Sequence, residues 1–164
     1  MELSIVWAPP VVLGVLIFKF YWQEVLFQCG LKCPQAPETK EGLDKMYGEW
    51  KEYYFIPLCA FALMEEFMFR YFPILCSLIL MKLYGPWSGI ATVMVAQIVF
   101  GISHGNIRNI PFQGVAGIMY TFLFVLFGGL HNFALGICVA TTAHLVWNMN
   151  CRYRFLEKYI PSLS

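Results

Sequence analysis

Five apolar stretches, each about long enough to cross a lipid bilayer, take up most of this chain and restrict what it can fold into. They lie at residues 3–28, 55–83, 88–104, 111–127 and 132–150. A transmembrane helix needs roughly 20 mainly apolar residues. Hydrocarbon accepts only helices and closed barrels, because every backbone polar group must be hydrogen-bonded internally. At 164 residues, the sequence therefore predicts an all-α, polytopic bundle of about five to six membrane helices.

Composition supports an integral, multi-pass membrane protein and excludes some other classes. Hydrophobic residues make up 59% of the chain and charged residues 13%, whereas soluble domains are roughly a quarter charged. The formal net charge is +1, and no basic tract indicates nucleic-acid binding. Lipid is thus the first expected partner, and nothing in the composition distinguishes one cellular membrane from another.

The apolar pattern divides the chain into four parts. Residues 1–28 are predicted to be an N-terminal membrane anchor helix, and residues 55–150 to be the membrane core. Between them, residues 29–54 form a polar loop, whose later part could be an amphipathic surface helix. Residues 151–164 are predicted to be a short polar tail. Within the core, the span at residues 55–83 is long enough to kink or split at Pro73, because proline removes a helical hydrogen bond.

Three charges stand within an apolar run of the core, at Glu65, Glu66 and Arg70. A charge near the bilayer centre costs about 2.5–3.5 kcal/mol on insertion scales, so intramembrane charges usually have a function and a partner. Glu66 and Arg70 are four residues apart and share a helix face, so we expect them to pair. Glu65 points about 100° away from Glu66 and is left to face a wet cavity. The alternative is a structural charge cluster that only fixes helix packing.

Two histidines lie within predicted spans. His104 ends its span on one face with Gln97, and His144 shares a face with Asn148, four residues later. For either histidine alone, a hydrogen-bonded core residue is the simpler interpretation. His131 follows a pair of glycines and is predicted to lie in a loop.

Taken together, these spans provide a carboxylate, two imidazoles and an amide around an intramembrane polar cavity. Such groups can activate a water molecule and stabilise an oxyanion. Glu65, His104 and His144 are also candidate ligands for a zinc ion. The residues alone leave both possibilities open.

Three motifs, in order and at helical spacing, resemble those of the CPBP family of intramembrane proteases, which includes the type II CAAX prenyl proteases and the bacterial Abi proteins. They are Glu65-Glu66-x-x-x-Arg70, Phe100-x-x-x-His104 and His144-x-x-x-Asn148. The resemblance identifies residues 55–150 as a CPBP-like protease core. It implies a multi-helix fold with a cavity inside the membrane.

The resemblance also implies roles for single residues. Glu65 and His104 would activate the attacking water, and His144 and Asn148 would stabilise the tetrahedral oxyanion. The supporting residues would be Glu66 and Arg70. Zinc is one option for this site and a bare glutamate base is the other; the lack of a His-Glu-x-x-His helix favours the metal-free mechanism.

The chain is shorter than usual for this family, whose members often have about eight spans. A homo-oligomer could complete the wall of the site. Gly136 and Ala140 present small residues at helical spacing, which is typical of close helix packing between membrane segments.

The leading functional hypothesis is an intramembrane endopeptidase acting on a prenylated CAAX protein or another membrane-tethered protein. One alternative is a non-catalytic membrane scaffold or immunity-type protein that keeps the fold. Another is a proton or cation carrier that uses Glu65, His104 and His144 as a relay. Asn148 argues against the carrier, because an amide does not titrate.

Overall fold

The computed structural model describes residues 4–31 and 55–159, with side chains described for residues 4–31 and 58–151. Most of the predicted polar loop and its possible surface helix fall outside the described residues, as does the end of the predicted tail.

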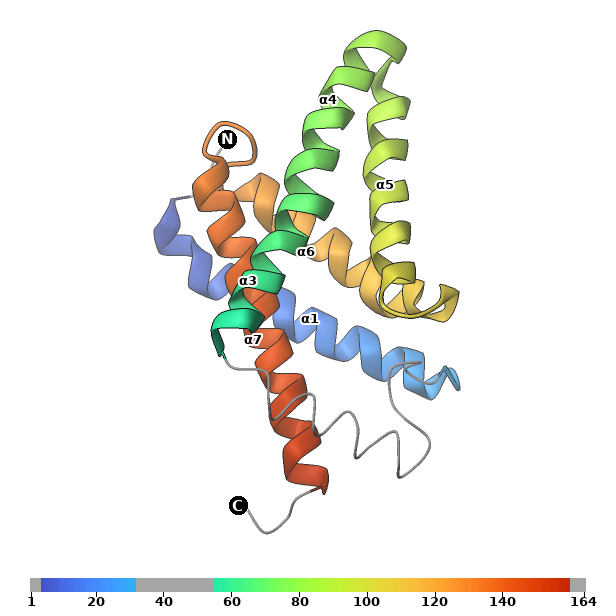
Figure 1. The fold of residues 1–164 in the computed structure, drawn as a ribbon, viewed down its shortest axis with the longest axis vertical. Helices are drawn as coiled ribbons and strands as arrows, with labels where there is room; N and C mark the ends of the chain where they lie inside the picture. Colours follow the sequence, from blue (N-terminus) through green and yellow to red (C-terminus); the bar gives the residue numbers. More distant parts are fainter. Residues whose placement is uncertain (1–3, 32–54, 160–164) are drawn as a thin grey trace.

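Every regular element in the described part of the chain is helical (Figure 1). In chain order they are η1 (Ile5–Trp7), α1 (Ala8–Gln28), α3 (Phe55–Glu66), η2 (Phe67–Tyr71), α4 (Phe72–Tyr84), α5 (Pro86–Ser103), η3 (Ile107–Asn109), η4 (Ile110–Gly114), α6 (Val115–Leu126) and α7 (Phe133–Tyr159). Elements η1 and η3 are 3₁₀ turns, whereas η2 and η4 are π turns. The all-α prediction is confirmed.

Four helical stretches among the described residues are long and apolar enough to cross a membrane. They are Ile5–Gln28, Leu58–Tyr84, Pro86–Ser103 and Ile107–Leu126. The fifth predicted span is present as α7, but it is not one of these four. Its sequence is less apolar because it carries the polar residues Thr141, His144 and Asn148. Helix α7 also continues to Tyr159 instead of ending near Asn150.

The helical stretch is not split at Pro73, but it contains the π turn η2 (Phe67–Tyr71) just before Phe72 and Pro73. In this turn the amide of Phe72 donates to the carbonyl of Phe67, five residues earlier. Pro73 has no amide hydrogen, so the carbonyl of Phe69 loses its usual helical donor. The side-chain amide of Gln97, on α5, donates to that carbonyl at 3.0 Å. A π turn is often found at a functional site, and this one follows Glu66 directly and contains Arg70.

Helices α4 and α5 form an antiparallel hairpin (Figure 1). The connection is Gly85, whose φ of 90° lies in the region that favours glycine. Pro86 follows at the first position of α5, where a missing amide hydrogen has no cost. Helix α4 follows the segment that carries the two glutamates, and α5 ends at His104, so the open end of the hairpin brings that segment near His104.

The apolar core is built mainly by α6 and α7, with side chains such as Phe124 and Ile137. Gly136 is buried in this interface, and a Cβ placed there would lie 2.6 Å from the carbonyl oxygen of Phe124. Ala140 is fully buried. Our sequence-based reason for an oligomer is therefore wrong, because these small residues pack within the chain. Oligomerisation itself stays a prediction.

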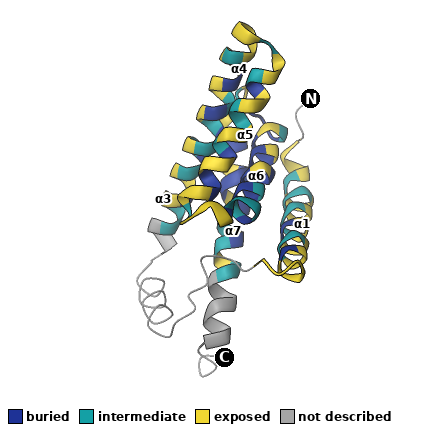
Figure 2. Ribbon diagram, turned by 90° about the vertical axis from the view of Figure 1, so that its right-hand side faces the viewer, coloured by how far each residue is buried: buried dark blue, intermediate teal, exposed yellow. Residues whose placement is uncertain are grey.

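Large apolar side chains cover the outer surface of several helices. Figure 2 shows exposed positions along α1, α4 and α5, while buried positions gather where α5, α6 and α7 meet. Exposed apolar faces of this extent are unusual for a soluble monomer. They are the surface expected to contact lipid, so the integral membrane assignment follows from the fold as well as from composition.

Replacing Gly136 by alanine is expected to destabilise the bundle by about 1–3 kcal/mol, since overpacking at a backbone contact forces the helices apart. Thermal unfolding in detergent would measure the loss. Gly14→Ala is the matched control, because a Cβ at Gly14 meets no atom within 4 Å. Equal unfolding temperatures for the two variants would contradict the close packing of α6 and α7.

Candidate active site

A fully buried ion pair lies at the centre of the bundle. The Nε atom of Arg70 is 3.1 Å from Oε2 of Glu66, and both side chains are 0% exposed. The pairing predicted from the four-residue spacing is thus confirmed. The face of the Phe100 ring lies against the guanidinium, with its centroid 4.3 Å from Cζ of Arg70, which adds a cation–π contact. Glu66 and Arg70 neutralise each other where no water reaches them.

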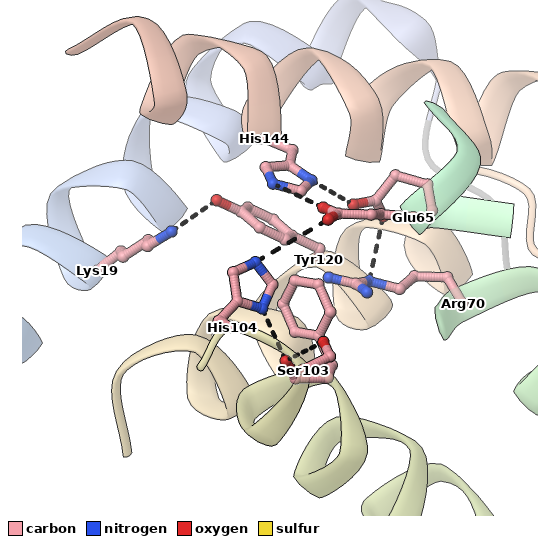
Figure 3. Close-up of polar contacts among 9 residues, drawn as sticks. Lys19, Glu65, Arg70, Ser103, His104, Tyr120 and His144 are labelled. Atoms are coloured by element: carbon pink, nitrogen blue, oxygen red, sulfur yellow. Dashed lines mark hydrogen bonds and ion pairs between the residues drawn. The ribbon is translucent and has the colours of Figure 1, made fainter. Parts of the chain in front are cut away.

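His144 connects this ion pair to Glu65 (Figure 3). Its Nδ1 lies 2.8 Å from Oε1 of Glu66. A carboxylate only accepts hydrogen bonds, so Nδ1 is the protonated, donating nitrogen. The other ring nitrogen, Nε2, lies 3.5 Å from Oε2 of Glu65. Glu66 therefore fixes which edge of the imidazole faces Glu65.

His104 is held by the end of α5. Its Nδ1 lies 2.7 Å from the carbonyl oxygen of Phe100, and a carbonyl can only accept. In the neutral ring Nε2 then carries the lone pair. The backbone oxygen of His104 accepts a bond from the side-chain amide of Asn109 at 2.7 Å, and Gly105 turns the chain with a φ of 129°. These contacts orient Nε2 towards Glu65 (Figure 3).

Glu65 lies between the two imidazoles and is the more open of the two glutamates. Its side chain is 29% exposed, and Oε1 lies 4.0 Å from Nε2 of His104. This separation is too long for a direct hydrogen bond, but one water with ordinary bonds of about 2.8 Å can span it. The structure therefore brings together Glu65, His104 and His144 from α3, α5 and α7.

Two other sequence-predicted positions are not part of this cluster. Asn148 lies one turn after His144 on α7 and is half-buried, but within the described residues it makes no hydrogen bond to Glu65, His104 or His144. His131 is exposed in the turn between α6 and α7, as predicted.

Sequence reasoning did not identify two residues behind the site. Tyr120 of α6 stacks its ring on that of His144, with centroids 4.9 Å apart and planes 20° from parallel. Lys19 of α1 donates to the Tyr120 hydroxyl at 2.8 Å. Lys19 could have been noticed in the sequence, because it is a lone lysine in the middle of an apolar span. No spacing rule, however, links Lys19 to Tyr120, which lies 101 residues later.

The donor set of Glu65, His104 and His144 is one that zinc accepts. The described residues, however, contain no group of three or more histidine, cysteine, aspartate or glutamate side chains arranged to hold a metal ion. Only Nε2 of His144 is left for a ligand, since Nδ1 is bonded to Glu66. The arrangement of the described side chains therefore does not fit a bound metal ion.

A family model described as type II CAAX prenyl endopeptidase Rce1-like matches residues 50–150. The chain belongs to this family of CAAX-type intramembrane proteases. No curated protein and no solved structure shows a match to the chain. The matched region contains Glu65, His104 and His144 but not α1. The family implies membrane-tethered proteins as substrates in general.

Proposed function

We propose that this protein is an intramembrane endopeptidase in which Glu65 is the general base that activates water. One observation carries the proposal. Glu65 is partly exposed between two imidazoles, whereas the adjacent Glu66 is buried and neutralised by Arg70. Two neighbouring carboxylates thus have different environments, and only one of them is open to a water and a substrate.

Water would be held between Oε1 of Glu65 and Nε2 of His104, which both accept hydrogen bonds. With its two hydrogens directed at these acceptors, the water turns a lone pair outward to the substrate carbonyl carbon. Glu65 takes a proton as the new C–O bond forms. The same proton is then delivered to the leaving amine nitrogen as the C–N bond breaks, so the carboxylate is regenerated.

Negative charge develops on the carbonyl oxygen when water attacks. In the proposal, His144 carries protons on both ring nitrogens, with Nδ1–H donating to Glu66 and Nε2–H to the oxyanion. Asn148 lies one turn further along the same helix. It would add an amide donor when substrate is bound, because catalytic hydrogen bonds often tighten only in the complex.

The proposed substrate is a prenylated protein with a C-terminal CAAX sequence, as the description of the matching family suggests. The large exposed apolar faces support this substrate, because a lipid-modified chain concentrates in the same bilayer. A substrate held in the bilayer also reaches an intramembrane glutamate that a soluble peptide does not.

Cleavage of a prenylated peptide by the full-length protein in lipid nanodiscs tests the proposal, with the same peptide lacking its prenyl group for comparison. We expect cleavage of the prenylated peptide and the same rate after treatment with a metal chelator, because Glu65 acts without a metal. Lack of cleavage of any membrane-tethered peptide would contradict the proposed activity. Loss of cleavage in chelator, restored by zinc, would contradict the metal-free mechanism alone.

A further inference from the structure

Lys19 is buried inside the bundle although it belongs to a lipid-facing helix. Its side chain is 1% exposed, whereas most of α1 is open on one side (Figure 2). The ammonium donates to the hydroxyl of Tyr120 at 2.8 Å and lies 4.2 Å from the centroid of the Trp147 ring. Within the described residues no carboxylate forms an ion pair with it. Its hydrogen-bond partner among the described residues is thus the tyrosine that backs the candidate site.

The Tyr120 ring transmits this contact to His144 (Figure 3). One face of the tyrosine stacks on the imidazole, with the planes 20° from parallel. A phenol fixed at its hydroxyl end cannot tilt freely, so a ring stacked on it is also restricted. His144 is consequently held on two sides, by Glu66 through Nδ1 and by Tyr120 through its face.

A charged residue is an expensive way to attach one helix to another. Lysine at the bilayer centre costs about 2.5–3.5 kcal/mol, while a hydrogen bond between membrane helices typically contributes about 0.6–2 kcal/mol. Helix α1 has a second, uncharged attachment, since Nε1 of Trp22 donates to the carbonyl of Pro111 at 2.7 Å. That bond does not involve Tyr120 or His144. The position of Lys19 therefore needs a reason other than attachment.

We propose that Lys19 is a positioning residue of the active site: its ammonium fixes the Tyr120 hydroxyl, and the Tyr120 ring holds the imidazole of His144 against Glu65 and Glu66. The inference rests on the proposed function for its effect on catalysis. It makes α1 a component of the site, although this helix precedes the region that matches the family, residues 50–150.

Kinetics in nanodiscs separate positioning from simple attachment. A misplacement of 1 Å can cost roughly a hundredfold in rate, so we expect Lys19→Met to lower kcat about tenfold and to change KM little. Tyr120→Phe, which keeps the ring, should cause a similar loss, and the double variant should be no worse than either. Lys19→Arg should restore most of kcat, because guanidinium also donates to a hydroxyl. Trp22→Phe, the control for attachment of α1, should keep the wild-type kcat.

A wild-type kcat in Lys19→Met, or an equal loss in Trp22→Phe, would overturn the positioning role. So would independent, multiplicative losses in the double variant. If Lys19→Met fails to accumulate, Lys19→Arg and Tyr120→Phe still give a comparison that tests the contact.

A second readout needs no protease activity. Carbethoxylation of histidine by diethyl pyrocarbonate can be followed by mass spectrometry, with exposed His131 as the internal reference. We expect His144 to react slowly in wild type and Trp22→Phe, and several times faster in Lys19→Met and Tyr120→Phe. Unchanged labelling would refute the positioning of His144 by Lys19. Faster labelling in a protein that cleaves no peptide would uphold it and count against the proposed function alone.

Discussion

Glu65→Gln is expected to reduce peptide cleavage by about 10²- to 10⁴-fold, the usual contribution of a general base. Glutamine has nearly the same shape as glutamate, so the fold and the neighbouring imidazoles are retained, but an amide cannot take a proton from water. The cleavage rate of a prenylated peptide, measured at equal amounts of folded protein, gives the result.

The matched control is Glu24→Gln, since Glu24 is an exposed glutamate of α1, away from the cluster. It should keep the wild-type rate and thermal stability. Full cleavage by Glu65→Gln would remove the glutamate mechanism. If instead wild type and Glu65→Gln both cleaved no peptide and Glu65→Gln still retained the biological role, the scaffold alternative would be supported.

Arg70→Met is expected to have the largest effect on folding. Removing one partner of a buried ion pair usually costs about 3–5 kcal/mol, because the other charge stays buried and unpaired. Here the unpaired group would be Glu66, which is 0% exposed. The amount of folded protein after membrane extraction, and its thermal unfolding, would both fall sharply.

The double variant Glu66→Gln/Arg70→Met should recover much of this stability, since both charges are removed and glutamine can still accept a bond from His144. Arg108→Met, at an exposed arginine in the loop after α5, is the control and should behave like wild type. Wild-type stability of Arg70→Met would contradict a buried ion pair at this position.

The sequence alone was sufficient to predict the helices and the contact between Glu66 and Arg70. Glu66 and Arg70 lie four residues apart, and helix geometry alone predicts that such a pair meets. His104 and His144 are far apart in the chain, so their convergence on Glu65 was expected only from the motifs and the resemblance. The structure shows their ring nitrogens at 4.0 and 3.5 Å from the carboxylate.

Other features depend on contacts that no local pattern encodes. The contact between Lys19 and Tyr120 joins α1 to α6, and nothing in either helix specifies the other. Pro73 predicted a kink or a split, but the identity of the donor to the released carbonyl, Gln97, required the packing of α4 against α5. Small residues at Gly136 and Ala140 were assigned to the wrong interface, since spacing shows that helices can approach closely but does not show which helix approaches.

The bond from Gln97 to the carbonyl of Phe69 has a consequence for how a bulky lipid-modified chain gains access. The side chain of Gln97 on α5 supplies a donor to the carbonyl that Pro73 leaves without one, so we expect α4 and α5 to move as one rigid hairpin between the segment that carries Glu65 and the end that carries His104. A rigid hairpin keeps Glu65 and His104 at a constant distance from each other, but its two helices do not separate to admit a substrate. The opening motion then falls to α1, which within the described residues is attached to the bundle through the side chains of Lys19 and Trp22.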